Sequence, residues 1–379
     1  MVIYPFRGPG VSAVGKRTQA ESRFSCQGPP PRASWPCGYE GVNDLMDEAR
    51  SVTERTVEDP SSEEASGRGG EAYEPAPGGR GPAEEGSLTA RVSRLAAYYE
   101  LTKPGIAGYV MVTAGVAYLV ASEGRADFLP VLATLLGTVL ATGGALALNQ
   151  FVEWELDARM ERTRNRPIPS GRLGAWEAFA VGNLLALGGI ALLFFTVGWL
   201  PAALTALSAL AYNLIYTPLK KVSYVSTLAG AFPGAMPTLI GWSAASGSLS
   251  LEAGSIFAIA YLWQLPHVLS LGWLLRKDYA RAGFYLIPRS DPLGRRIAWH
   301  ITAYSATLLV VGLVPTWIGV TGTLYLVGMG MLGGLLLALA LATLEGDRLT
   351  ATAARRVFLG SLAYHPLFLM LLLLDALRS

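Results

Sequence analysis

The chain has 379 residues, of which 51% are hydrophobic and 15% are charged. A composition this apolar excludes an ordinary soluble protein and predicts a polytopic membrane protein with several bilayer spans. The formal net charge of +2 hides an asymmetry, because the first ninety residues carry many of the acids and the spans almost no charge, so it says little about partners. No nucleic-acid partner is expected.

Residues 1–90 are predicted to form a disordered tail, ahead of a membrane domain over residues 91–379. The tail is rich in Gly, Pro, Ser, Glu and Arg and has too few apolar residues to offset the entropy lost on ordering. Basic residues dominate its first forty positions, which weakly indicates an organellar targeting segment, although Met46 is an equally good later start. Cys26 and Cys37 have no second ligand pair nearby and indicate neither a zinc site nor a disulfide framework.

Nine apolar segments follow the tail, each close to the twenty or so residues that cross a hydrocarbon core of about 30 Å. We therefore predict an all-α fold of about nine transmembrane helices around a central cavity. The segments lie at about 104–122, 128–152, 175–197, 199–217, 226–245, 253–274, 297–319, 322–343 and 357–376.

Basic residues in the connecting loops predict the orientation of these spans. They cluster after the second, fourth, sixth and eighth spans, whereas the intervening loops carry only Arg125. The positive-inside rule then places the amino terminus and the even loops on the cytoplasmic or matrix side. The loops after spans two and six are the most polar, and we expect them to close over one cavity.

The end of the second span carries three polar side chains at helical spacing. Asn149, Glu153 and Asp157 stand at i, i+4 and i+8, so they share one stripe of a helix. Carboxylate and amide oxygens suit Mg²⁺, which commonly reaches a protein through one or two carboxylates and the phosphates of a substrate. Four arginines in the next nine residues supply donors for phosphate oxygens. The stripe predicts a diphosphate site; the alternative is a salt-bridged helix end beside a positive-inside loop.

The sixth span and its loop carry a second polar group. His267 follows Pro266 inside the span, and Asp278 lies in the loop among basic residues. Polar residues at membrane depth usually face a cavity or a partner, so His267 is a candidate functional residue. The alternatives are that His267 bonds a carbonyl freed by Pro266, and that Asp278 only forms a loop ion pair instead of holding a cation.

Several motifs together resemble one known family. They are Asn149-x-x-x-Glu153-x-x-x-Asp157-x-x-Met160-x-Arg162-Thr163-x-x-Arg166-Pro167, Tyr216-Thr217-x-Leu219-Lys220, Gly234-Ala235-x-Pro237-x-x-Ile240-Gly241-Trp242, Trp263-Gln264-x-Pro266-His267 and Asp278-Tyr279-x-x-Ala282-Gly283. The first motif alone is typical of the wider superfamily of intramembrane prenyltransferases. The last two resemble the protoheme IX farnesyltransferase family, and the resemblance covers about residues 97–376.

The resemblance implies a Mg²⁺-dependent transfer of farnesyl from farnesyl diphosphate to a vinyl group of haem b, which gives haem O. It implies Mg²⁺ ligands that also serve catalysis at Asn149, Glu153, Asp157 and Asp278. It implies substrate contacts at Lys103, Arg162, Arg166, Tyr216, Lys220 and His267. The His267 imidazole can ligate a haem iron, orient a propionate or relay a proton.

The resemblance also implies a place in the cell. A bacterial cytoplasmic membrane with a cytoplasmic active site is favoured, and the alternative is a mitochondrial inner membrane with a matrix-facing site. The lipid bilayer surrounds the protein in both cases. A downstream haem A synthase is a candidate partner.

The sequence departs from the family pattern at three places. Glu153 stands where the family normally has Asp, which lengthens the ligand arm by a methylene. Gly105 replaces an expected Arg, which removes one phosphate contact or lipid anchor. Phe284 and Tyr285 stand where the family commonly has a hydrophobic residue and Pro, so the turn before Pro288 is expected to differ.

Two other functions are weighed against this one. A sibling prenyltransferase acting on a phenolic or quinone-precursor ring would carry a second Asp-x-x-x-Asp cluster after span six, but only Asp278 lies there before Asp291. A membrane transporter would show repeated halves with broken helices and charges at the midplane. The charged clusters of this chain are instead expected at one face.

Overall fold

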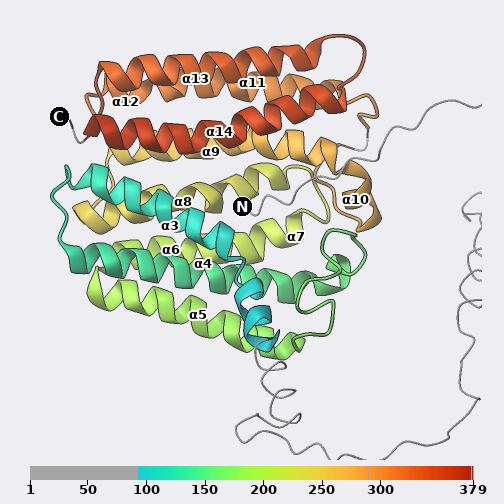
Figure 1. Cartoon of the computed structure of the whole chain (residues 1–379), viewed down its shortest axis with the longest axis horizontal. Helices are drawn as coiled ribbons and strands as arrows, with labels where there is room; N and C mark the ends of the chain where they lie inside the picture. The colour runs from blue at the N-terminus through green and yellow to red at the C-terminus, as the bar shows by residue number, and fades with distance from the viewer. Residues whose placement is uncertain (1–92, 289, 377, 379) are drawn as a thin grey trace, which may run out of the picture. The chain divides into compact units, whose positions relative to one another are not determined.

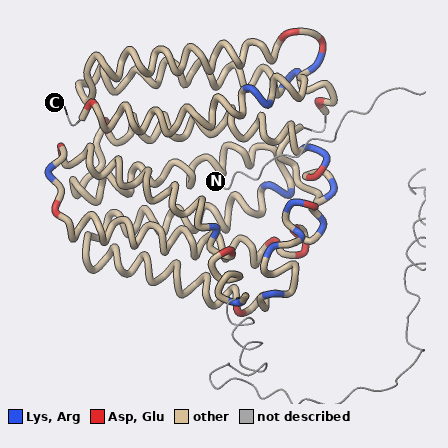
Figure 2. The backbone as a smooth tube through the Cα atoms, viewed as in Figure 1, with Lys and Arg blue, Asp and Glu red and all other residues tan. Residues whose placement is uncertain are grey.

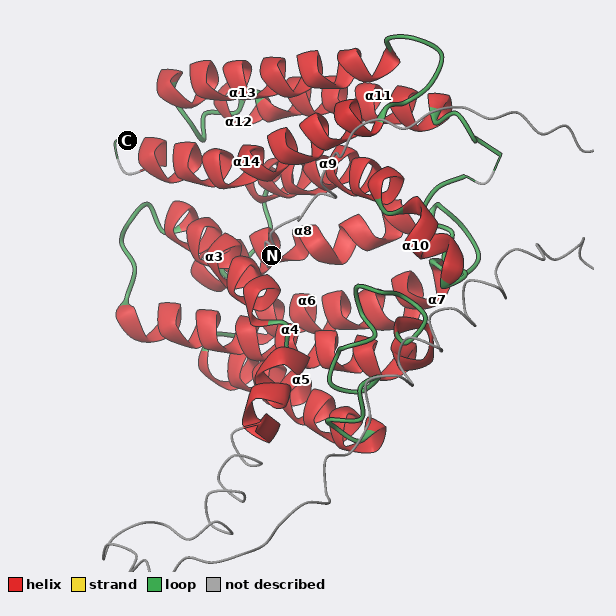
Figure 3. Cartoon of the chain, turned by 45° about the vertical axis from the view of Figure 1, so that its right-hand side comes forward, coloured by secondary structure: helices red, strands yellow, loops and turns green. Residues whose placement is uncertain are grey.

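The structure is a computed structural model that describes residues 93–288, 290–376 and 378 (Figure 1). The predicted tail, with its two cysteines and Met46, lies outside the described residues. Within the described part the fold is all-α and contains no strand (Figure 3). This confirms the predicted fold class.

Residues 93–101 are helical and lead into the bundle. The helices that follow are α3 (Pro104–Ala121), α4 (Phe128–Asp157), α5 (Ala175–Thr196), α6 (Trp199–Leu210), the π-helix η2 (Ala211–Tyr216), α7 (Thr217–Leu219), α8 (Ser226–Ser246), α9 (Leu251–Leu274), α10 (Arg276–Arg281), α11 (Arg295–Gly312), α12 (Val314–Trp317), α13 (Thr323–Leu341), the 3₁₀ turn η3 (Ala342–Leu344) and α14 (Ala351–Ala376).

Eight helices of the described residues are long and apolar enough to cross a membrane, where nine spans were predicted. The remaining predicted span corresponds to α8, which has 21 residues but is not among the eight. It contains Pro233 and Pro237, and about half of its residues are buried against other helices. A helix that faces protein more than lipid needs less apolar surface, and neighbouring helices can satisfy the backbone groups that proline frees.

Close contacts between helices depend on glycine. A Cβ atom on Gly144 in α4 would lie 2.4 Å from the backbone nitrogen of Ala186 in α5. A Cβ atom on Gly241 in α8 would lie 1.9 Å from the carbonyl oxygen of Ala114 in α3. Helices in lipid associate largely through such close packing of small residues. These glycines therefore bring α3, α4, α5 and α8 close enough to enclose a site.

The remaining long helices form a second packed group. Helices α9, α11, α13 and α14 share a core that includes the fully buried side chains of Ile259, Ile297, Ile301, Leu308 and Phe368. Figure 1 shows this group above α8, with α3, α4, α5 and α6 on the other side. Helix α8 packs against both α3 and α9, so it joins the two groups.

Charged residues gather mainly at one end of the bundle (Figure 2). The loop after α4 and the short helix α10 meet there, because Arg281 Nη1 lies 2.9 Å from Glu161 Oε1. The predicted meeting of the loops after the second and sixth spans is thus confirmed. The opposite end carries few charges in this view, which fits the sparse charge of the odd loops.

Candidate active site

The stripe at the end of α4 forms as the spacing predicts. Helix α4 is continuous to Asp157, so Asn149, Glu153 and Asp157 lie on one face. All three are buried, with 2%, 2% and 1% of their surface exposed. Ionised groups are seldom buried this deeply without a partner, so the stripe requires compensating charge.

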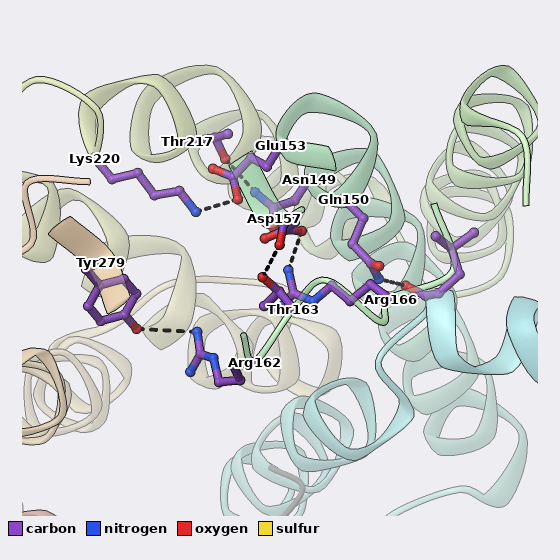
Figure 4. Close-up of polar contacts among 11 residues, drawn as sticks. Asn149, Gln150, Glu153, Asp157, Arg162, Thr163, Arg166, Thr217, Lys220 and Tyr279 are labelled. Carbon is purple, nitrogen blue, oxygen red and sulfur yellow. Dashed lines mark hydrogen bonds and ion pairs between the residues drawn. The ribbon is translucent and has the colours of Figure 1, made fainter. Parts of the chain in front are cut away.

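Two cations supply that charge. Lys220 Nζ lies 2.5 Å from Glu153 Oε2, and Arg166 Nη1 lies 2.5 Å from Asp157 Oδ2 (Figure 4). The amide of Asn149 donates to the Thr217 hydroxyl at 3.1 Å. Lys220 and Thr217 come from the end of the fourth span, so the second and fourth spans build the cluster together.

The loop after α4 is held by the aspartate that ends the helix. The Thr163 hydroxyl donates to the Asp157 carbonyl at 2.7 Å, and the backbone nitrogen of Arg166 donates to the Thr163 carbonyl at 3.0 Å. These bonds turn the loop back so that Arg166 reaches the Asp157 carboxylate. Arg166, nine positions after Asp157 in the sequence, therefore lies beside it in space.

Lys103 stands beside the same cluster, at the start of α3. Its backbone is left-handed, with φ 46°, directly before Pro104. Burial lowers the pKa of its ammonium to about 7, and repulsion from Arg166 and Lys220 adds to this effect. Burial also lowers the pKa of Lys220, although the Glu153 carboxylate opposes that shift. Uncommon backbone geometry at such a position is typical of functional sites.

The second polar loop covers the cluster. Arg162 Nη2 lies 3.5 Å from the Tyr279 hydroxyl of α10 (Figure 4). The backbone nitrogen of Tyr285 donates to the Lys220 carbonyl at 2.8 Å, and Lys220 Nζ lies 4.7 Å from the centre of the Phe284 ring. The departure at Phe284 and Tyr285 thus has a structural role, because both residues hold the loop against Lys220.

The donor set fits a metal shared with a substrate better than a metal held by protein alone. Within the described part of the chain, no group of three or more His, Cys, Asp or Glu residues is placed to hold a metal ion. However, Glu153 Oε1 and Asp278 Oδ1 are both buried without a hydrogen-bond partner. Two stripe carboxylates, one amide and these open oxygens suit Mg²⁺, which usually keeps waters and binds substrate phosphates. The role of Asp278 as a ligand stays a prediction.

An apolar cavity of about 360 Å³ lies next to the cluster. Tyr212 and Tyr216 line it from the π-helix η2, a type of helix often found at functional sites. Lys220 Nζ lies 5.3 Å from the Tyr216 ring, so the charged cluster and the apolar cavity meet at that residue. A Cβ atom on Gly234 would lie 1.9 Å from Gln264 Oε1, which explains the glycine in this wall.

His267 lies apart from the charged cluster, and within the described residues its hydrogen bond and ring contacts go to other side chains than the phosphate candidates. Its Nδ1 is 3.0 Å from the Ser361 hydroxyl of α14, and its ring stacks on Phe358. A second histidine, His365, is 2% exposed, and its Nδ1 is 2.5 Å from the Tyr109 hydroxyl. The sequence analysis missed His365, although a histidine inside an apolar span is itself a signal of a functional or partnered residue.

Comparison with known proteins identifies the family of this chain. Residues 110–362 match the UbiA prenyltransferase family. The chain belongs to that family. A protoheme IX farnesyltransferase of Solibacter usitatus is 41% identical over 287 residues, which cover 73% of this chain and 98% of the relative. One of Salinibacter ruber is 39% identical, with 73% of this chain and 98% of the relative covered.

Solved UbiA-type structures share the arrangement of helices. A digeranylgeranylglyceryl phosphate synthase has a TM-score of 0.66 at 17% identity and covers 76% of this chain and 99% of its own. A UbiA homolog from Archaeoglobus fulgidus, bound to GPP and Mg²⁺, has a TM-score of 0.51 at 12% identity, with 73% and 99% covered. At these identities the likeness concerns the fold. It supports the UbiA arrangement of helices in this chain.

The UbiA fold brings most of the predicted site residues together. Asn149, Glu153 and Asp157 meet Arg166 and Lys220 directly, as their hydrogen bonds show. Arg162 lies within 3.5 Å of the Tyr279 hydroxyl in the loop above the cluster. Tyr216 borders both the cluster and the cavity. Lys103 interacts electrostatically with the carboxylates of Glu153 and Asp157. Asp278 lies on α10 beside Tyr279 without a bond to the stripe. His267 is the predicted residue that lies elsewhere.

Proposed function

We propose that this protein transfers the farnesyl group of farnesyl diphosphate to a vinyl group of haem b, giving haem O for the assembly of terminal oxidases. The observation that carries the proposal is a buried carboxylate stripe, paired with cations, beside an apolar cavity. The names of relatives that are 39–41% identical and covered over almost their whole length support haem as the acceptor.

The charged cluster would hold the diphosphate. Asn149, Glu153 and Asp157, with Asp278 from the loop above, are the residues that would hold Mg²⁺. Bound Mg²⁺ would neutralise negative charge on the departing diphosphate. Lys103, Arg162, Arg166 and Lys220 would contact the phosphate oxygens. Donors fixed at the place where charge develops stabilise the transition state more than the ground state.

The ion pairs of the cluster suggest how the diphosphate is received. Lys220 and Arg166 are each held at 2.5 Å by a carboxylate, so both cations point into the cluster. A dianionic or trianionic phosphate group would draw the two cations to itself and free the carboxylates for a metal. Positive charge fixed close to the leaving group in this way is a large contribution to catalysis.

The apolar cavity would hold the prenyl chain. Its volume of about 360 Å³ lies within the ordinary range of small-molecule sites. Departure of the diphosphate leaves an allylic cation, which the haem vinyl group attacks to form the new carbon–carbon bond. Water then captures the porphyrin-conjugated cation as an alcohol and releases a proton. Apolar walls matter because they keep water from the allylic cation until that bond has formed.

The acceptor would lie on the side of His267. A neutral imidazole contributes little to a diphosphate but can reach a haem iron or a propionate. The cluster of basic loops favours a bacterial cytoplasmic membrane with the site on the cytoplasmic side, or a mitochondrial inner membrane with the site in the matrix. The product would pass to a haem A synthase.

Expression in a bacterial strain that lacks its own haem O synthase tests the proposal. Membrane haem is extracted and separated by reversed-phase chromatography, where the farnesyl chain lengthens retention greatly. The wild-type chain should add a late-eluting haem. Asp157→Ala should abolish it, whereas Asp347→Ala, a fully exposed carboxylate in the loop before α14, should not. No new haem from the wild-type chain, or a farnesylated phenolic lipid instead, would refute the proposal.

A further inference from the structure

A second cavity, of about 270 Å³, lies at the charged end of the bundle, between the end of α9 and the start of α14. It shares no lining residue with the apolar cavity. Its lining consists of Trp273, Arg276, Pro292, Leu293, Arg348, Leu349, Thr350 and Ala351. The proposed function makes no use of it.

The lining of this cavity is positively charged and contains no carboxylate. Arg276 is held in place, because its guanidinium lies 4.3 Å from the centre of the Trp273 ring and donates to the Trp273 carbonyl at 2.8 Å. Neither Arg276 nor Arg348 forms an ion pair within the described part of the chain. Both guanidinium groups are therefore available to an anion.

The acidic residues nearby are engaged elsewhere. Asp291 accepts hydrogen bonds from the backbone nitrogens of Arg295 and Ile297, at 2.9 and 3.0 Å, at the start of α11. Asp347 lies fully exposed, 3.9 Å from Arg295. Neither acid thus forms an ion pair with Arg276 or Arg348.

A further donor and a helix end border the cavity. Trp273 is 4% exposed, and its indole Nε1–H is buried without an acceptor. The same edge of the indole approaches Gly294, next to Leu293 in the lining, since a Cβ atom there would lie 3.0 Å from Trp273 Cζ2. The 26-residue helix α14 begins at Ala351 in the lining; its Ala353 amide donates to the Thr350 hydroxyl at 3.1 Å, and the helix dipole favours an anion at this end.

We propose that this cavity binds the phosphate group of an anionic membrane phospholipid. Forked guanidinium donors match phosphate oxygens, and basic pockets between spans at the charged side of a membrane are suited to acidic headgroups. Leu293, which is 49% exposed at the rim, offers apolar surface to the rest of the lipid. A bound lipid would also steady α10, because Arg276 begins that helix and Asp278 lies in the same first turn.

Lipid retention by the purified full-length protein measures this binding. The protein is placed in nanodiscs of mixed phosphatidylglycerol and phosphatidylcholine, stripped with detergent, and its retained lipid is quantified by mass spectrometry. Arg276→Gln with Arg348→Gln should lower the enrichment of phosphatidylglycerol by about 25-fold, at about fivefold per arginine. Arg355→Gln with Arg356→Gln, exposed on α14 outside the cavity, should change it by less than about twofold. An equal loss of phosphatidylglycerol enrichment in both double variants would mean that general surface charge causes the effect, and it would refute the proposed site.

Two further experiments distinguish a lipid headgroup from free phosphate and control for misfolding. Inorganic phosphate should displace phosphatidylglycerol only weakly; strong phosphate binding without any enrichment of phosphatidylglycerol would overturn the lipid assignment. Trp273→Phe keeps a six-membered aromatic ring under Arg276 and removes the pyrrole ring that carries the N–H. It should lower retention severalfold in protein that is still folded by circular dichroism, and unchanged retention would exclude the indole and refute the proposed geometry. Farnesyl transfer is not the readout, so this test can fail without touching the proposed function.

Discussion

The buried pair of Lys220 and Glu153 should be strongly coupled in stability. Glu153 is 2% exposed, and the side chain of Lys220 is 11% exposed, with 2.5 Å between Nζ and Oε2. Lys220→Met leaves a buried carboxylate whose Oε1 already lacks a hydrogen-bond partner. Removing one partner of such a pair costs about 3–5 kcal/mol, because the other charge stays buried and uncompensated.

The two single substitutions should differ. Lys220 also lies near the Phe284 and Tyr216 rings, so after Glu153→Met the ammonium keeps part of its stabilisation. Glu153→Met should therefore cost less than Lys220→Met. The double variant should return to within about 1–2 kcal/mol of the wild type, because an apolar pair replaces a buried ion pair at little cost.

The free energy of unfolding can be measured in mixed micelles by denaturant titration, followed by far-ultraviolet circular dichroism. The exposed pair of Arg281 and Glu161, with side chains 58% and 75% exposed, serves as a control. Its single substitutions should cost less than about 1 kcal/mol. If the losses of Lys220→Met and Glu153→Met simply add in the double variant, the ammonium reaches water instead of the carboxylate, and the reasoning is refuted.

Three further outcomes are expected. Glu153→Asp should transfer farnesyl at least as fast as the wild type, because a shorter arm loosens the contact with lysine and frees the carboxylate; a loss beyond about tenfold in the haem assay would contradict the metal role. Gly241→Ala should destabilise the protein by about 1–3 kcal/mol, since its Cβ meets a backbone oxygen at 1.9 Å. A Cβ atom on Gly254 would meet nothing within 4 Å, so Gly254→Ala should leave the free energy of unfolding unchanged or raise it. Equal effects of the two substitutions would rule out the close contact at Gly241. His267→Ala should weaken use of haem and spare binding of farnesyl diphosphate, whereas Arg166→Ala should do the reverse; a joint loss of both substrates with a normal melt would remove the haem role.

Periodicity predicted the parts of this structure that depend on one helix at a time. The stripe at Asn149, Glu153 and Asp157 is visible from its spacing, because one helical face repeats every three or four residues. The partner of Glu153 cannot be predicted in this way, since Lys220 lies 67 positions away and no local pattern specifies that pairing. The fold brings the two together by packing α4 against the end of the fourth span.

Hydropathy likewise predicts the spans that face lipid, but it does not predict which buried residues contact one another. Helix α8 forms where its span is predicted, and its prolines and small polar residues reflect burial among other helices. No motif surrounds His365, and its partner Tyr109 comes from α3, far away in the sequence. The turn of π-helix that places Tyr216 has no clear sequence pattern and follows from tertiary packing.

The bond between Tyr109 and His365 has a consequence for biosynthesis. The two residues are 256 positions apart, in the first and last long helices of the bundle, and their side chains meet at 2.5 Å. A ribosome that adds about 5–20 residues per second needs roughly 10–50 s to travel that distance. Throughout this interval α3 resides in the bilayer with a polar hydroxyl that has not yet met its imidazole. Helix α3 can already pack against α4 and α8, but its side that meets α14 stays uncovered until translation is almost complete.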